Sequence, residues 1–126
     1  MTESIGEDII PRIEYDDFGT ELKESLRSKV ERLGYCGEIW RVGANAPKSM
    51  FCFAEMTEAL KSEIDMKLVE LVALTSAGIM GNTYERNQHE RLSNTLEYGR
   101  DWIKQVNELQ AEPGRHMSDA ECAVQK

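Results

Sequence analysis

Residues 65–99 decide the fold, and they read DMKLVELVALTSAGIMGNTYERNQHERLSNTLEYG. The first half is apolar almost all round, which is typical of a helix at the centre of a bundle. Gly81 can end such a helix in the left-handed conformation that other residues avoid. Asn82 can cap the next helix, with Glu85 completing a capping box. The stretch therefore predicts helices over 65–80 and 83–98 that fold into an antiparallel helical hairpin.

Two titratable side chains lie on opposite arms of this predicted hairpin. Glu70 interrupts the apolar run, and a carboxylate on an apolar stripe needs a partner when it is buried. At about 1.5 Å per residue, Glu70 lies about 16 Å before the turn and His89 about 12 Å beyond it. Helix axes about 8–10 Å apart would let the two side chains meet directly or through one water. The alternatives are a buried structural pair, or an i,i+4 surface pair between Glu85 and His89.

The pattern also resembles a known family. The run 70–74 (ELVAL), the run 81–85 (GNTYE) and His89 are similar to the signature of the carboxymuconolactone decarboxylase and alkylhydroperoxidase D superfamily. The upstream stretch 11–56 resembles the helices that precede the central hairpin in that family. The resemblance implies an all-α, AhpD-like helical bundle with its site built around the hairpin.

One departure from the family pattern decides the chemistry that the resemblance implies. Peroxidase members carry a Cys-x-x-Cys pair where this chain has Asn82 and Glu85. What remains is the decarboxylase-like branch, which uses general acid–base groups and no cofactor or metal. His89 would be the base or acid, because imidazole titrates near neutrality. Glu70 would orient it or donate a proton, and Asn82, Tyr84 and Glu85 would line or orient the site.

Two further features could take part in function. Arg41 could anchor an anionic substrate, although a surface or interface ion pair is the simpler interpretation. The three cysteines, Cys36, Cys52 and Cys122, are odd in number and widely spaced, so they predict neither a disulfide framework nor a zinc site. We expect Cys36 and Cys52 to be small core residues.

Length and composition limit the number of domains and the classes of partner that are expected. At 126 residues the chain is expected to form a single domain, 1–126. A net charge of −8 disfavours binding to nucleic acid or to an anionic membrane. The apolar run is too interrupted to span a bilayer, and the polar, acidic start predicts no signal peptide, so a cytoplasmic protein is expected.

Periodicity places the other elements outside the hairpin. Residues 1–17 are expected to form an acidic N-terminal arm. Helices are predicted over 20–33, 36–46, 47–61 and 100–109. The last segment, 111–126, is expected to be a C-terminal tail in which a capping box at Ser118 starts one more helix.

These observations support three hypotheses. The first is a lyase-like enzyme that decarboxylates or isomerises a small organic acid or lactone. The second is a non-catalytic subunit or binding module with the same fold. The third is a peroxidase that uses other cysteines. The resemblance also implies a homo-oligomer, trimeric or hexameric, and the short C-terminus leaves open completion by another subunit.

Overall fold

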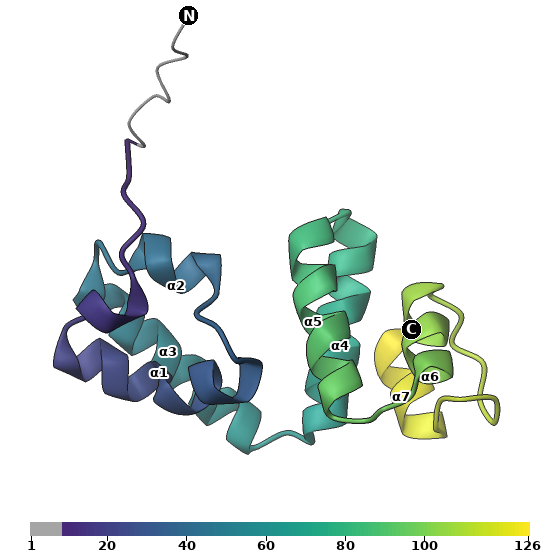
Figure 1. Ribbon diagram of the computed structural model, residues 1–126. Helices are drawn as coiled ribbons and strands as arrows, with labels where there is room; N and C mark the ends of the chain where they lie inside the picture. Colours follow the sequence, from purple (N-terminus) through teal and green to yellow (C-terminus); the bar gives the residue numbers. More distant parts are fainter. Residues whose placement is uncertain (1–8) are drawn as a thin grey trace, which may run out of the picture. The chain divides into compact units, whose positions relative to one another are not determined.

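A computed structural model describes residues 9–126, so part of the predicted acidic arm, residues 1–8, lies outside the described residues. Within the described part the chain forms seven α-helices, one short 3-10 helix and no β-strand, which confirms the all-α class (Figure 1). The domain expected over 1–126 is organised as two compact units, Met1–Ala59 and Leu60–Lys126. Each unit is described by itself.

The first unit contains the 3-10 helix η1 and three α-helices. Their bounds are Tyr15–Asp17 for η1, Thr20–Leu33 for α1, Glu38–Gly43 for α2 and Pro47–Ser62 for α3, whose last residues pass into the second unit. The predicted bounds of α1 are confirmed, because Gly34 ends it with a φ of 77° and a bond from its N–H to the carbonyl of Val30. The core of this unit comprises Phe18, Leu22, Leu26, Trp40, Ala44 and Ala54.

The described end of the acidic arm is attached to this unit. The N–H of Ile13 donates to the carbonyl of Arg41 at 3.0 Å, and the Ile13 side chain packs on the core. Ile9 and Ile10 are exposed. Ile13 is therefore the isoleucine of the arm that packs on the core, and Asn45 also donates to the carbonyl of Pro11 at 2.6 Å.

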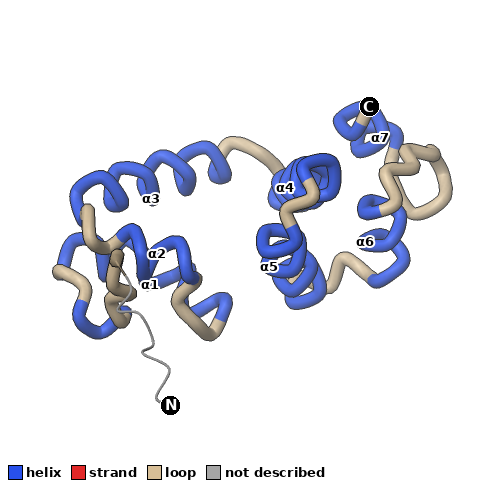
Figure 2. Tube along the Cα trace, turned by 90° about the horizontal axis from the view of Figure 1, so that it is seen from above, coloured by secondary structure: helices blue, strands red, loops and turns tan. Residues whose placement is uncertain are grey.

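The second unit contains the stretch from which the fold was predicted. Its helices are α4 (Met66–Met80), α5 (Thr83–Thr95), α6 (Arg100–Asn107) and α7 (Asp119–Gln125). Figures 1 and 2 show α4 and α5 side by side, and α4 also contacts α6 and α7. The apolar sequence of α4 is explained by these three neighbours.

Two residues join α4 to α5. Gly81 has a φ of 65°, and the N–H of Asn82 donates to the carbonyl of Ala77 at 2.9 Å, which is the bond of a Schellman motif. The side chain of Asn82 then accepts the N–H of Glu85 at 3.1 Å and caps α5. Asn82 thus ends one helix and begins the next, which explains the short connection.

The end of α5 differs from the prediction. The helix ends at Thr95 and not at residue 98, because Glu97 takes a φ of 58°. The N–H of Tyr98 then donates to the carbonyl of Ser93 at 3.1 Å, and that of Glu97 to Asn94 at 3.1 Å. This is again a Schellman ending, with a glutamate in the position that glycine usually occupies.

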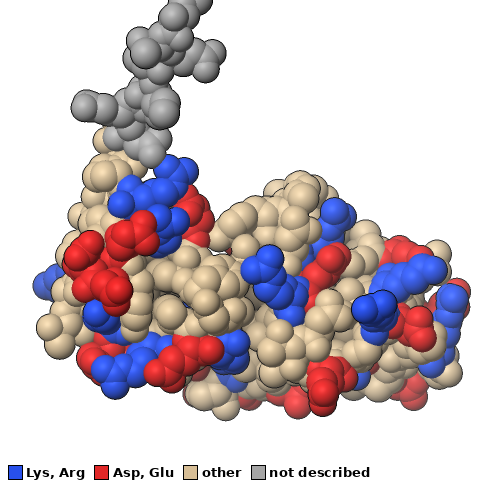
Figure 3. Space-filling view, viewed as in Figure 1, with Lys and Arg blue, Asp and Glu red and all other residues tan. Residues whose placement is uncertain are grey.

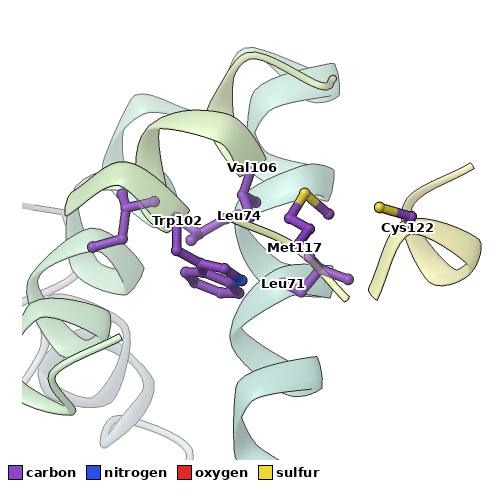
Figure 4. Close-up of a cluster of buried hydrophobic side chains, with 7 residues drawn as sticks. Leu71, Leu74, Trp102, Val106, Met117 and Cys122 are labelled. Atoms are coloured by element: carbon purple, nitrogen blue, oxygen red, sulfur yellow. The ribbon is translucent and has the colours of Figure 1, made fainter. Parts of the chain in front are cut away.

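The core of the second unit gathers residues from α4, α6 and the C-terminal segment (Figure 4). Its buried members are Leu71, Leu74, Trp102, Ile103, Val106, Met117 and Cys122. Burying one side chain of this size contributes about 1.5–3 kcal/mol. The C-terminal segment therefore belongs to the core.

Helix α7 is held by polar contacts as well. The predicted capping box of Ser118 and Glu121 is present. The Glu121 carboxylate also accepts the indole N–H of Trp102 at 3.1 Å and lies 3.4 Å from the ammonium group of Lys67. A single carboxylate thereby links α7 to α6 and α4.

The surface is mixed in charge. Figure 3 shows acidic and basic side chains interspersed on the viewed face. Several apolar side chains of α4 are nonetheless exposed, with exposed fractions of 50% for Val72, 67% for Ile79 and 78% for Met80. Among residues 9–126, no helix combines the length and apolarity that crossing a membrane requires.

Candidate functional site

The two side chains whose contact was predicted from spacing lie together in the second unit. Glu70 lies on the buried side of α4 with 1% of its side chain exposed, and His89 lies on α5 with 21% exposed. The distance from Nδ1 of His89 to Oε2 of Glu70 is 2.8 Å. The predicted pairing of Glu70 with His89 is confirmed, and the contact is direct.

This contact decides which nitrogen of His89 is available. A carboxylate only accepts hydrogen bonds, so Nδ1 carries the proton that is donated to Glu70. The other nitrogen, Nε2, then has a lone pair in the neutral ring. An imidazole oriented by a carboxylate at one nitrogen and open at the other is the arrangement of a general base.

Glu85 lies at the open nitrogen. Its Oε2 is 3.5 Å from Nε2 of His89, and 41% of its side chain is exposed. The capping box that was predicted for Asn82 and Glu85 forms only in part: the Asn82 side chain accepts the backbone N–H of Glu85, while the Glu85 carboxylate faces His89.

Ser93 belongs to the site and was missed from the sequence. Its side chain is fully buried, and its hydroxyl donates to Oε2 of Glu70 at 3.4 Å. The signal was present, since Ser93 follows His89 by four residues and so lies on the same face of α5. The spacing alone does not identify Ser93 as a site residue, because its role depends on its hydrogen bond to the buried carboxylate of Glu70.

Tyr98 is the second residue that sequence reasoning missed. Burial raises its pKa above the ordinary value of 10.0, and the carboxylates of Glu70 and Asp65 raise it further. Its ring packs edge-on against Trp102 with centroids 5.4 Å apart. The phenol therefore experiences the charge of Glu70 and stays protonated to higher pH.

The remaining predicted site residues are not brought to His89 by the described contacts. Asn82 is engaged in capping α5, and Tyr84 is 41% exposed. Arg41 belongs to the first unit, where its guanidinium pairs with Glu14 and lies 3.4 Å from a carboxylate oxygen of Glu38. The ion-pair interpretation of Arg41 is the one that the structure supports.

The cysteines do not form a redox pair in the structure. All three are free thiols: Cys36 is half-buried, Cys52 is exposed and Cys122 is buried. The expectation that Cys52 is a core residue is wrong, because it lies on the outer side of α3 beside a cavity of about 430 Å³ lined also by Leu22 and Phe51. Burial raises the pKa of Cys36, Arg41 opposes that shift, and Glu14 adds to it.

A groove of about 330 Å³ lies where α5 meets α6. Its lining includes Glu90, Asn94, Arg100, Lys104 and Asn107, and it contains none of the predicted site residues. Within residues 9–126, no group of three or more His, Cys, Asp or Glu side chains is arranged to hold a metal ion.

Comparison of the chain with protein-family models, with curated proteins and with solved structures finds no match.

Proposed function

We propose that the protein is a cofactor-free acid–base enzyme whose reacting group is the imidazole of His89. The observation that carries the proposal is the 2.8 Å contact between Nδ1 of His89 and the buried carboxylate of Glu70. The contact fixes the ring and its tautomer, and it stabilises the imidazolium that forms when Nε2 takes a proton. Partial exposure of His89 gives a substrate access to that nitrogen.

The reaction that suits this group is proton transfer next to a carbonyl. An imidazole can remove a proton from carbon and return it to another atom, which is an isomerisation. It can also protonate the carbanion left when a carboxyl group departs as CO₂. The resemblance to the carboxymuconolactone decarboxylase superfamily favours a small organic acid or lactone as the substrate.

The alternatives are ranked by the same geometry. A fully sealed or fully exposed pair would favour a non-catalytic subunit, whereas here the carboxylate is buried and the imidazole is partly open. A thiol peroxidase of this family needs a Cys-x-x-Cys pair, and the chain has Asn82 and Glu85 at those positions. We also propose that the protein acts in the cytoplasm as a homo-oligomer, since the exposed apolar side chains of α4 provide a surface for association.

Replacement of the two paired residues tests the enzymatic proposal. Small lactones and 2-oxo or unsaturated dicarboxylic acids form the substrate screen. His89→Gln and Glu70→Gln should each lower turnover by about 10²–10⁴-fold, because the first removes the base and the second removes the charge that holds the imidazolium. His116→Gln is the matched control, since His116 is the other histidine and is exposed. Turnover at the parent rate in both test variants, or no turnover of any compound by the parent, would refute the proposal.

A further inference from the structure

We infer that Glu85 is the third member of a proton chain, Glu70–His89–Glu85, and that its carboxyl group exchanges the proton with the substrate. The inference rests on the proposed function and deepens it, because it moves the point of contact with the substrate from the imidazole to Glu85. Glu85 was expected only to line or orient the site. Its position next to Nε2 gives it a chemical role.

Burial decreases in steps along the chain of three groups. The exposed fraction of the side chain is 1% for Glu70, 21% for His89 and 41% for Glu85. The two contacts use opposite nitrogens of one ring, 2.8 Å at Nδ1 and 3.5 Å at Nε2. The imidazole therefore connects a buried carboxylate to one that reaches the surface.

The outer contact, 3.5 Å from Nε2 to Oε2 of Glu85, has room for a shared proton. With Nδ1–H donated to Glu70, the lone pair of Nε2 and an ionised Glu85 oxygen are both acceptors and repel each other. A proton placed between them removes the repulsion, either as an imidazolium beside two carboxylates or as a carboxylic acid beside a neutral ring. The outer contact is therefore a storage site for one proton.

The proton transfer between the substrate and Glu85 needs no other reagent. The ionised Glu85 carboxylate takes a proton from a carbon next to the substrate carbonyl, so a C–H bond breaks, an O–H bond forms, and the electron pair stays on the substrate as an enolate. The proton already stored on Nε2 stays on the imidazolium, which is stabilised by Glu70 and lies beside the newly protonated Glu85. The reverse path returns the proton to the product.

The neighbouring carboxylate on α5 provides a matched comparison. Glu90 follows His89 directly, yet its Oε1 accepts the amide N–H of Asn107 at 2.6 Å and lies 3.8 Å from Nε of Arg86. Its described contacts lead away from the imidazole. Glu90→Gln therefore removes a charge of the same sign from the same helix and leaves the proposed chain intact.

Acylation by diethyl pyrocarbonate tests the shared proton without a substrate. The reagent attacks an unprotonated imidazole nitrogen, and its rate at His89 and at His116 can be followed separately by mass spectrometry at neutral pH. Glu85→Gln should raise the rate at His89 by about fivefold or more, because the amide cannot hold the proton that blocks Nε2. Glu90→Gln should leave that rate within about twofold of the parent, as should all variants at His116. An unchanged or lower rate at His89 in Glu85→Gln would overturn the inference.

Chemical rescue tests the catalytic role on whichever compound the screen identifies. Glu85→Ala should lose about 10²-fold or more in turnover, and added formate should restore part of it, because the exposed position admits a small carboxylate. Formate should not restore His89→Gln. Full turnover in Glu85→Ala together with loss in His89→Gln would overturn the role of Glu85 and leave the Glu70–His89 proposal standing. Full turnover in His89→Gln would instead refute the proposed function itself. Helical circular dichroism confirms that each variant is folded.

Discussion

The hydroxyl of Ser93 donates to the same oxygen of Glu70 that faces Nδ1 of His89. Both donors come from α5, one helical turn apart, and the acceptor comes from α4. A buried carboxylate is stable only when such donors replace the water that it loses on folding. The packing of α4 on α5 and the orientation of the imidazole therefore depend on each other.

The first prediction concerns this hydroxyl. Ser93→Ala should lower the free energy of unfolding by about 1–3 kcal/mol, because it removes one donor from a buried charge. Ser76→Ala is the control, since Ser76 is exposed on α4 and its loss should cost less than about 0.5 kcal/mol. Urea unfolding followed by circular dichroism measures both. Equal stability of the Ser93→Ala variant and the parent would show that the hydroxyl does not support Glu70.

The second prediction concerns pH. Because the pKa of Tyr98 is raised by burial and by Glu70, the folded chain holds the phenolic proton to higher pH than the unfolded chain. The stability that this provides is present below the ordinary tyrosine pKa and is lost as pH rises through the folded value. Absorbance of tyrosinate should show Tyr98 ionising at lower pH in Glu70→Gln than in the parent. Tyr98→Phe should remove this component of the titration, and an unchanged Tyr98 curve in Glu70→Gln would contradict the proximity of the two groups.

The third prediction concerns thiol reactivity. The thiolate is the form that reacts with iodoacetamide, so the raised pKa and partial burial of Cys36 should make it react several-fold more slowly than exposed Cys52. Arg41→Gln should slow Cys36 further, because Arg41 lowers that pKa, and Glu14→Gln should speed it up. Peptide mass spectrometry distinguishes the sites. Changes in the opposite directions would show that these charges do not act on Cys36.

The fourth prediction concerns assembly. The exposed apolar residues Val72 and Ile79 lie two turns apart on one face of α4, and Met80 follows. The parent should scatter light as an oligomer at micromolar concentration, and Ile79→Lys should reduce its mass. Asn87→Lys, at an exposed polar position of α5, provides a control with the same added charge. A parent that is monomeric under these conditions would end the proposal of self-association.

Local signals explain which parts of the fold could be predicted. Asp65 caps α4 by accepting backbone N–H groups of its first turn, and Gly81 and Asn82 likewise act on backbone groups nearby. The bounds of α4 and the start of α5 therefore followed from the sequence alone. The end of α5 did not, because Glu97 accepts a left-handed conformation that its own side chain does not favour.

Tertiary contacts explain what the sequence could not provide. The spacing of Glu70 and His89 predicted their contact because both lie on regular helices of known rise. The roles of Ser93 and Tyr98 depend on Glu70 of α4, and periodicity does not contain that information. The functional residues that were missed are those whose role exists only through a partner on another helix.

Each compact unit has one tryptophan, and the two indoles have different surroundings. Trp40 lies under the ammonium group of Lys29, which is 4.5 Å from the ring, whereas Trp102 donates its N–H to Glu121. Replacing either indole with phenylalanine leaves a fluorescent reporter in one unit only. Denaturation curves of the two single-tryptophan proteins would then coincide if the units unfold in one cooperative step and would separate if they do not. Each unit therefore contains one tryptophan whose fluorescence reports the unfolding of that unit alone.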